Sequence, residues 1–226
     1  MKQGTIEFVL VGRDVGRLER VAADLRVRSL QSSVQTSQSC FVDPVAIQAT
    51  VDAIVSDGSV DIVLIAHGSL PVQEDCQNNL SACEEAMQIN GVSPALFAEA
   101  FAKHMTQAGQ GTLALIGSVA GDRGRKSNYV YGAAKSLLAR YAEGLQHRLA
   151  GTGVKVVLLK PGPTDTPMTA HLKGQGIKLA PVEIVAAQIV AAIEQGKATA
   201  YVPGKWRIIM LVIRHLPAFI FNKLDI

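Results

Sequence analysis

The sequence has few of the residues that would indicate a metal centre, a disulfide framework or a membrane span. Its three cysteines, Cys40, Cys76 and Cys83, are an odd number without a Cys-x-x-Cys pair, and its five histidines are scattered. We therefore expect neither a metal site nor disulfides, and this cysteine usage fits a reducing cytosol. No run of about 18 or more apolar residues is present, so we expect no helix that crosses a membrane.

Charge is also sparse. Charged residues make up 18% of the chain, the formal net charge is +3, and no dense tract of Lys and Arg stands out. Nucleic acid is therefore not an expected partner. The opening segment from Met1 to Glu7 is short and polar, unlike a signal peptide, so a cytoplasmic location is expected.

What the sequence does have is enough apolar material for one substantial core, with 226 residues of which 48% are hydrophobic. Apolar runs typical of buried parallel strands alternate with stretches of helical period. This alternation predicts an α/β fold with a doubly wound, Rossmann-type parallel sheet in three αβα layers. The expected strands are 6–11, 37–42, 60–66, 111–117, 154–160 and 198–203, and the expected helices are 14–28, 44–56, 80–108, 129–150 and 182–195.

The tail differs from the rest of the chain. We expect the Rossmann domain to span residues 1–203 and a separate apolar tail to span 204–226. The segment WRIIMLVIRHLPAFIF (206–221) is strongly apolar and is interrupted by Arg214, His215 and Pro217. It could lie on a membrane surface, pack on a substrate pocket or form a subunit interface, and the sequence leaves these readings open.

Three polar residues between 116 and 135 have the spacing of a proton-transfer site. Ser118 ends a predicted strand, Tyr131 follows thirteen residues later, and Lys135 comes four residues after Tyr131. Residues i and i+4 share a helix face, so we expect the Lys135 ammonium to lower the phenol pKa of Tyr131 from about 10. Ser118 could hydrogen-bond a substrate oxygen on which charge develops. The alternative is an ordinary position on a helix surface.

This arrangement resembles the catalytic set of the short-chain dehydrogenases/reductases. In that family the Tyr is the general acid/base, the Lys lowers its pKa and holds the nicotinamide ribose, and the Ser orients the substrate. The resemblance assigns these roles to Tyr131, Lys135 and Ser118, and Asn90 matches the fourth catalytic residue, which supports a proton-relay water. It implies an enzyme that moves a hydride between a nicotinamide cofactor and a carbonyl or alcohol.

Further segments resemble the family's cofactor-binding motifs. LIAHG (64–68) stands where the family usually has NNAG, and KPGPTDTPM (160–168) resembles its PG motif. VLVGRDVGRL (9–18) resembles the second strand and the helix after it, where an Arg meets the adenosine 2′-phosphate, so NADP(H) is favoured and NAD(H) is the alternative. Besides Tyr131 and Lys135, the residues expected to contact the cofactor are Gly12, Arg13, Ala66, His67, Gly68, Pro161, Gly162, Thr164 and Thr166.

One family motif is not found. The TGxxxGxG loop, whose glycines let the backbone reach the pyrophosphate, should follow the first strand. Gly12 and Gly16 do not fit it, because Gly12 lies 54 residues before Ala66, close to the usual separation of the second strand from NNAG. We therefore expect a Rossmann domain without its first β-α unit. Either Met1 is not the true start, or the protein is truncated, with a rearranged or dimer-completed sheet. A non-catalytic Rossmann-like interaction subunit is accordingly kept as the alternative function.

The substrate is indicated only by resemblance. VAGDRGRKSNYVYGAAK (119–135), PTDTPMT (163–169) and the tail are similar to reductases that act on polyprenylphosphoryl-2-keto-ribofuranose. That implies a lipid-linked 2-keto sugar and peripheral contact with the inner membrane face through the tail, the alternative being another small-molecule ketone. The expected anion contacts are Lys205, Arg207 or Arg214, with Arg123, Arg125 and Lys126 as a second group, for which solvated surface is the alternative. The helices at 80–108 and 129–150 resemble the family's dimer-forming pair, so a homodimer or homotetramer is expected.

Overall fold

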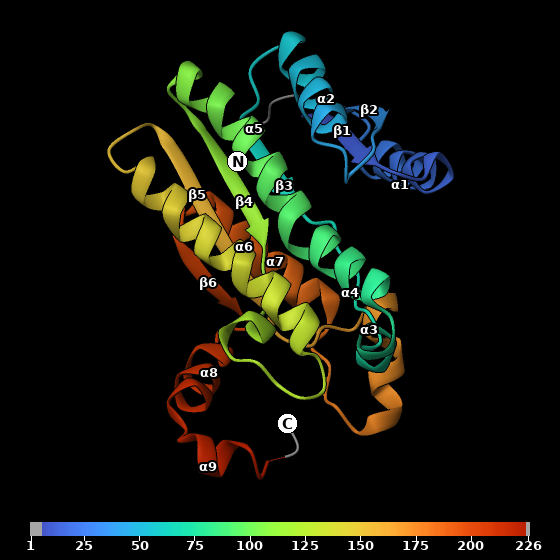
Figure 1. Cartoon of the computed structure of the whole chain (residues 1–226). Coiled ribbons are helices and arrows are strands. Elements are labelled where there is room, and N and C mark those ends of the chain that lie inside the picture. The colour runs from blue at the N-terminus through green and yellow to red at the C-terminus, as the bar shows by residue number, and fades with distance from the viewer. Residues whose placement is uncertain (1–5, 225–226) are drawn as a thin grey trace. The chain divides into compact units, whose positions relative to one another are not determined.

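The computed structural model describes residues 6–224, whose strands and helices alternate along the chain. The chain forms two compact units, Met1–Ser59 and Val60–Ile226, and each is described here by itself (Figure 1). All strand pairs in the described residues are parallel, as the alternation of strands and helices predicts. Met1, on which the question of the true start depends, lies outside the described residues.

The first unit is a pair of strands, each followed by a helix: β1 (Glu7–Gly12), α1 (Val15–Arg28), β2 (Ser33–Gln38) and α2 (Pro44–Ser56). β1 and β2 pair in parallel along their whole length. An aspartate begins each helix, because a short carboxylate can accept the backbone N–H groups that have no partner in the first turn. Asp14 accepts from the Arg17 amide and Asp43 from the Val45 amide, both at 2.9 Å.

The strand predicted at 37–42 is wrong in position, since β2 ends at Gln38. The apolar group Cys40-Phe41-Val42 suggested a strand, yet it lies in the loop that leads to α2. Phe41 is buried from that loop, so its side chain belongs to the core without belonging to a strand. The strand itself, SVQTSQ, is polar because it pairs with one neighbour and buries only Val34 deeply.

The second unit is built on a four-stranded sheet with the order β3-β4-β5-β6. Its strands are β3 (Ile62–Ile65), β4 (Gly111–Ile116), β5 (Val154–Pro161) and β6 (Thr199–Val202). Helices α5 (Ser93–Ala108) and α6 (Tyr129–Arg148) cross one face of this sheet and α7 (Val182–Glu194) the other (Figure 1). The central strands are almost wholly apolar because they are covered on both faces, and Leu113, Leu115 and Leu158 are fully buried.

The helix predicted at 80–108 is interrupted. It consists of α4 (Leu80–Met87), a π-helical turn over Gln88–Val92, and α5, and it is preceded by a short helix α3 (Gln73–Asn78) that the sequence pattern does not indicate. In the π turn the Ser93 amide donates to the Gln88 carbonyl. Such turns are frequent at functional sites, and this one carries Asn90.

The tail folds as two further helices of the second unit, α8 (Trp206–His215) and α9 (Ala218–Phe221). Met210, a residue of α8, is completely buried. The guanidinium of Arg123 donates from Nη1 to the carbonyl oxygens of Ile213 and Leu216, at 2.5 and 2.6 Å, and lies 3.8 Å from the centre of the Phe221 ring. Arg123 therefore supplies the C-terminal carbonyls of α8 with a cation. Within residues 6–224, no helix has both the length and the apolar content needed to cross a membrane.

Candidate active site

Helix α6 lies directly on the turn that carries Ser118, and glycine makes this contact possible. Ser118 is followed by a 3₁₀ turn over Val119–Asp122. A Cβ on Gly132 would lie 2.9 Å from the Ala120 carbonyl oxygen, and one on Gly121 would lie 2.8 Å from the backbone of Lys135. Real Cβ atoms do not approach backbone this closely, so these glycines allow the turn and the helix to meet backbone to backbone.

This contact brings Ser118, Tyr131 and Lys135 together. The hydroxyl oxygen of Ser118 accepts a hydrogen bond from the Ala120 amide at 3.1 Å, and the Ser118 side chain also hydrogen-bonds the Tyr131 phenol. The ammonium of Lys135 is buried, lies 5.8 Å from the centre of the Tyr131 ring and donates to the Ile116 carbonyl oxygen at 2.9 Å. A hydroxyl, a phenol and an ammonium thus share one end of the sheet.

The titration of the two central groups is governed by burial. Burial raises the pKa of the Tyr131 phenol, and the hydrogen bond with Ser118 acts in the opposite direction. Burial lowers the pKa of Lys135 to about 8. The expectation that Lys135 lowers the phenol pKa is therefore not met in the isolated chain, where burial raises this pKa and the opposing effect comes from Ser118. At neutral pH both groups hold their protons, which is the state that a proton donor requires.

Asn90 lies at the same end of the unit. Its side chain is fully buried, its Oδ1 accepts from the Ser69 amide at 2.9 Å, and its Nδ2 donates to the Ala86 carbonyl oxygen at 2.9 Å. A Cβ on Gly68 would lie 2.8 Å from Asn90 Oδ1 and 3.6 Å from Lys135 Nζ. Asn90 therefore fixes the Gly68–Ser69 segment beside the buried ammonium, while its part in a proton relay stays a prediction.

The remaining expected cofactor contacts of the second unit lie on two loops. His67 Nε2 is 2.9 Å from Ser93 Oγ, and its ring packs edge-on against Phe97 at a centroid distance of 5.5 Å. Ala66 next to it is exposed. Pro161 ends β5, and Thr164 donates to the Gly162 carbonyl oxygen at 2.9 Å.

Thr166 lies further along the second loop, at the start of a 3₁₀ helix, Pro167–Gln175, where its hydroxyl is 3.2 Å from that of Thr169. Gly12 and Arg13 belong to the first unit. Gly12 ends β1, and the absence of a Cβ there leaves room for the side chain of Leu18, which an added Cβ would meet at 2.9 Å. Arg13 follows it, is exposed, and its carbonyl oxygen accepts from Gln38 at 3.0 Å. The structure therefore brings Ser118, Tyr131, Lys135, Asn90 and Gly68 together in one unit, and Gly12 and Arg13 lie in the other.

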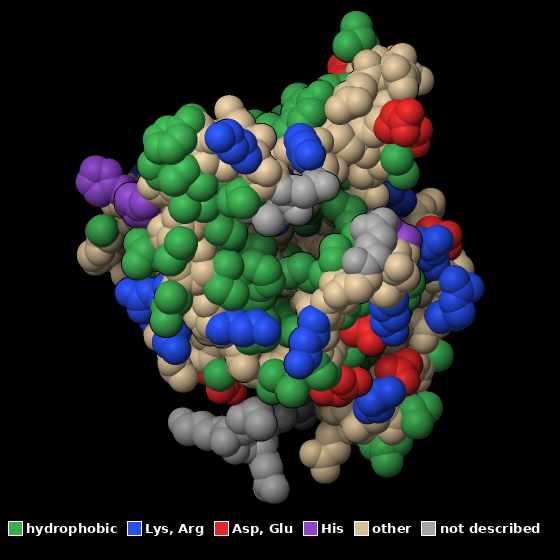
Figure 2. Space-filling model, turned by 90° about the horizontal axis from the view of Figure 1, so that it is seen from below, with side chains coloured by type: hydrophobic (Ala, Val, Ile, Leu, Met, Phe, Trp, Pro, Cys, Tyr) green, Lys and Arg blue, Asp and Glu red, His purple; other side chains and the backbone are tan. Residues whose placement is uncertain are grey.

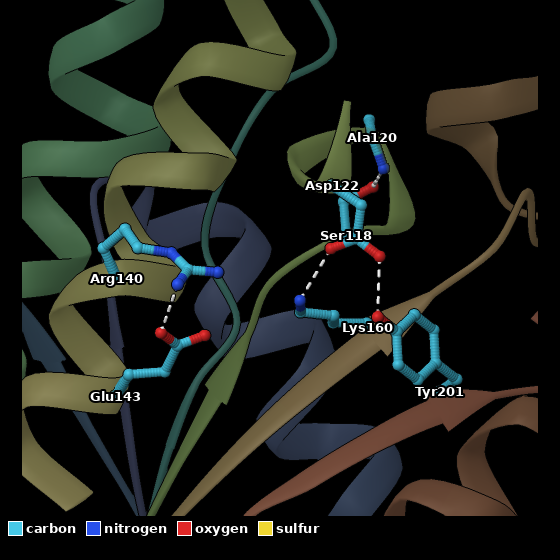
Figure 3. A network of polar contacts seen from close by, with 7 residues as sticks. All are labelled: Ser118, Ala120, Asp122, Arg140, Glu143, Lys160 and Tyr201. Atoms are coloured by element: carbon cyan, nitrogen blue, oxygen red, sulfur yellow. Dashed lines mark hydrogen bonds and ion pairs between the residues drawn. The ribbon is translucent and has the colours of Figure 1, made fainter. Parts of the chain in front are cut away.

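Sequence reasoning missed a buried polar set beside the site. Asp122 Oδ1 lies 2.6 Å from Lys160 Nζ, and Asp122 Oδ2 accepts from the Tyr201 hydroxyl at 2.7 Å (Figure 3). One signal was available, because Lys160 follows the apolar run Val156–Leu159 near the end of its strand, and a charge in that place requires a partner. The sequence does not identify Asp122 as that partner, since the two residues lie 38 positions apart.

Trp206 was also missed. A Cβ on Gly162 would lie 1.9 Å from Trp206 Nε1, so the indole at the start of α8 rests directly on the Pro161–Gly162 turn. The tail is thereby part of the surroundings of the site. Arg123, expected as an anion contact, is instead bound to the carbonyl oxygens at the end of α8.

Comparison with known proteins agrees with this geometry. The family described as short chain dehydrogenase matches residues 1–176. An uncharacterized oxidoreductase of Streptomyces coelicolor is 30% identical over 215 residues, which are 95% of this chain and 84% of that protein. An uncharacterized oxidoreductase of Mycobacterium tuberculosis (strain ATCC 25618 / H37Rv) is 30% identical over 218 residues, 96% of this chain and 87% of that protein.

Solved structures share the fold. A short-chain type dehydrogenase/reductase from Mycobacterium ulcerans superposes with a TM-score of 0.79 at 16% identity, over 96% of this chain and 89% of that one. A short-chain dehydrogenase from Sphingobium yanoikuyae in complex with NADPH gives 0.75 at 21%, over 97% and 87%. A 3-oxoacyl-[acyl-carrier protein] reductase from Brucella melitensis in complex with NAD gives 0.77 at 21%, over 89% and 87%. The predicted Rossmann-like α/β class with parallel sheets is confirmed.

Replacing Lys135 should change how stability depends on pH. The pKa of Lys135 is about 8 in the folded chain against an ordinary value of 10.5, so between these values the unfolded chain binds more protons and stability rises with pH. Below this window the buried ammonium lowers the free energy of unfolding by about 3 kcal/mol. We expect Lys135→Met to have a higher free energy of unfolding than the wild type at about pH 7 and to lose most of that advantage by about pH 10.5, where the unfolded chain also gives up this proton.

Urea unfolding at several pH values measures the difference, with Lys103→Met, an exposed lysine of α5, as the matched control. A difference between wild type and Lys135→Met that is the same at both ends of the window would show that burial does not disfavour this ammonium.

Proposed function

The chain belongs to the short-chain dehydrogenase family, and on this basis we propose that it is an NAD(P)-dependent oxidoreductase that reduces a ketone to an alcohol. The observation that carries the proposal is the meeting of Ser118, Tyr131 and Lys135 at one end of the sheet. A phenol held against a hydroxyl, with a buried ammonium behind its ring, is suited to proton transfer to a carbonyl oxygen.

Bound NADPH or NADH would supply the hydride to the carbonyl carbon. The chain's own residues would act on the oxygen. Ser118 would donate a hydrogen bond to it, and Tyr131, which holds its proton at neutral pH and whose pKa burial raises further, would deliver the proton. Lys135, still largely protonated at neutral pH with a pKa of about 8, would stabilise the negative charge left on the phenol oxygen.

Features of the second unit fit a nicotinamide nucleotide. The backbone at Gly68 passes so close to Asn90 and Lys135 that a side chain would fill the space there, as expected where a backbone approaches a ligand closely. By resemblance, the contacts in this unit are Ala66, His67, Gly68, Tyr131, Lys135, Pro161, Gly162, Thr164 and Thr166. Gly12 and the exposed Arg13 of the first unit would meet the adenosine end, and an Arg in that place favours NADP(H) because a guanidinium binds phosphate well.

The proposed substrate is a lipid-linked 2-keto sugar, with the tail as the contact to lipid at the inner membrane face. The face of α8 that points away from the unit is apolar: Ile208, Leu211 and Val212 are each more than half exposed, and Phe219 of α9 is 70% exposed. Lys205, Arg207 and Arg214 flank these side chains. Figure 2 shows apolar side chains gathered on this side of the molecule, with Lys and Arg at their margins. An apolar face flanked by cations suits an anionic lipid surface.

The organisation of the chain is proposed from the sequence pattern and the family resemblance. Residues 1–203 would form the nucleotide-binding part, with 204–226 as the tail, and α5 and α6 would form the interface of a homodimer or homotetramer, as the resemblance implies. We also propose that the family's first β-α unit is not part of this sequence, since no TGxxxGxG loop is found in it.

Replacing Tyr131 should abolish most of the activity. We expect Tyr131→Phe to lower kcat by about 100- to 10,000-fold, because the proton donor is lost while the ring remains. The measurement is NADPH oxidation with soluble ketones, followed by absorbance. Tyr129→Phe is the matched control: Tyr129 lies in the same turn, is 44% exposed, and has Ala133 four residues further on.

Equal rates for Tyr131→Phe and wild type would refute the assignment of Tyr131. A folded wild-type chain that oxidises no NADPH with any ketone would instead favour the non-catalytic interaction subunit.

Replacing Arg13 should change cofactor selectivity. We expect Arg13→Ala to weaken NADPH binding about tenfold and to leave NADH binding unchanged, because only NADPH carries the 2′-phosphate. Fluorescence titration with each nucleotide measures both constants. Arg17→Ala, a neighbouring exposed arginine paired with Asp14, is the control. A loss of equal size for both nucleotides would contradict a phosphate contact at Arg13.

Polar substitutions on α8 should remove lipid binding without harming the fold. We expect the chain to sediment with vesicles of phosphatidylcholine and phosphatidylglycerol, and Ile208→Ser with Leu211→Ser to abolish this, because both side chains are exposed. The exposed Val45 of α2, changed to Ser, is the control. The double variant should still reduce a soluble ketone at the wild-type rate. Unchanged sedimentation of the double variant would exclude this face as the lipid contact.

A further inference from the structure

The carboxylate of Asp122 is buried at the end of the turn that begins with Ser118. Its side chain is 2% exposed, and both of its oxygens have partners: Oδ1 lies 2.6 Å from Lys160 Nζ, and Oδ2 accepts from the Tyr201 hydroxyl at 2.7 Å (Figure 3). Lys160 is buried as deeply, with 5% of its side chain exposed, and its Nζ lies 5.4 Å from the centre of the Tyr201 ring. We name Asp122, Lys160 and Tyr201 the buried triad.

The partners of Asp122 lie on two adjacent strands. Lys160 of β5 and Tyr201 of β6 are opposite each other in the strand register, and Lys160 immediately precedes the Pro161–Gly162 turn. The carboxylate therefore fastens the end of the Ser118 turn to the carboxyl ends of both strands. On its other side the turn rests on α6 through Gly121 and Gly132.

A second buried lysine holds the other end of the same segment. Lys135 Nζ donates to the carbonyl oxygen of Ile116, two residues before Ser118, at 2.9 Å. Lys160 binds the same segment four residues after Ser118, through its ion pair with Asp122. Ser118 thus lies between two fixed residues. Ile116 is bound to α6, and Asp122 is bound to the strands β5 and β6.

Stability alone does not account for such a triad. Removing two charges from water is unfavourable, and apolar side chains of similar volume often make a fold as stable as a buried ion pair does. What an ion pair adds is direction, because Asp122 satisfies both partners in only one placement of the turn. The same turn carries Ser118, whose side chain hydrogen-bonds the Tyr131 phenol.

We propose that Asp122, Lys160 and Tyr201 are positioning residues that hold the Ser118 hydroxyl against the phenol of Tyr131. They act through Ser118, and their contacts are with one another rather than with the reacting atoms. The consequence for catalysis rests on the proposed function, since a ketone oxygen must be met by both the hydroxyl and the phenol. The placement of the turn itself does not depend on that function.

The test replaces the triad by apolar side chains of similar size, Asp122→Leu, Lys160→Met and Tyr201→Phe together. This triple variant removes both members of the buried ion pair together, so it should fold even where Asp122→Asn alone does not, although the partly buried Arg125 loses its electrostatic attraction to Asp122. The control is Glu143→Gln, which breaks an ion pair of the same 2.6 Å length between Arg140 and Glu143 on the exposed side of α6 (Figure 3).

Hydrogen exchange gives the first readout, and it needs no activity. The Ala120 amide donates to Ser118 Oγ and the Gly121 amide to the Ser118 carbonyl oxygen, so both report on the turn. We expect both amides to exchange at least about tenfold faster in the triple variant, with β4 and β5 unchanged. A folded triple variant with unchanged exchange in the turn would overturn the proposal.

Kinetics gives the second readout. We expect the triple variant to lower kcat for a soluble ketone by about 100-fold while the KM for NADPH stays the same. A small misplacement of the Ser118 hydroxyl is enough to slow the chemical step by this factor. In a Ser118→Ala background the triad substitution should have no further effect on kcat, since these residues act through Ser118. A full additional loss in that background would refute action through Ser118. A wild-type chain without ketone reduction would sink the proposed function, while the exchange result still decides whether the triad places the turn.

Discussion

Two buried ammonium groups constrain the second unit, because each must be met by oxygen atoms inside the protein. Lys135 reaches the carbonyl oxygen of Ile116, and Lys160 reaches the carboxylate of Asp122. These two oxygens lie at either end of the segment that carries Ser118, so the demand of each lysine for a partner also fixes the serine. A buried charge without a partner would be strongly unfavourable. Neither the Lys135–Ile116 contact nor the Lys160–Asp122 contact can therefore be broken without a rearrangement of the surrounding segments.

The same constraint explains why glycine recurs around the site. The segment between the two anchors has to lie against α6, and side chains at Gly121 and Gly132 would prevent that approach. The approach in turn puts the Tyr131 phenol within hydrogen-bond reach of Ser118, and both side chains are partly buried there. The raised phenol pKa and the lowered ammonium pKa are therefore consequences of the packing, and they leave both groups protonated at neutral pH.

The sequence predicts the parts of this arrangement that depend on local pattern. Apolar runs identify the strands of the main sheet, and the helix predicted at 44–56 has the bounds of α2. The proximity of Tyr131 and Lys135 follows from their helical spacing. Contacts between distant segments are not encoded in such patterns. The hydrogen bond between Asn90 and Ser69 joins residues 21 positions apart, and the position of β2 is hidden by a polar strand next to an apolar loop. Asp122, Lys160 and Tyr201 come from three separate elements, so only the fold reveals them as one set.

The tail has two faces that meet different demands. Its inner face is fixed by Trp206 on Gly162 and by the buried Met210, and its C-terminal carbonyls are held by Arg123. Its outer face leaves Ile208 and Leu211 exposed. Arg123, which holds the end of α8, is the next residue after Asp122. Burial and Asp122 raise the pKa of Tyr201, and a hydrogen bond with Arg214 of α8 acts in the opposite direction. Helix α8, whose outer face is exposed, is therefore bound by Arg123, which is adjacent to Asp122 in the turn that carries Ser118. On the proposed function, the apolar group of a lipid-linked substrate would contact an element whose other face rests on the Pro161–Gly162 turn.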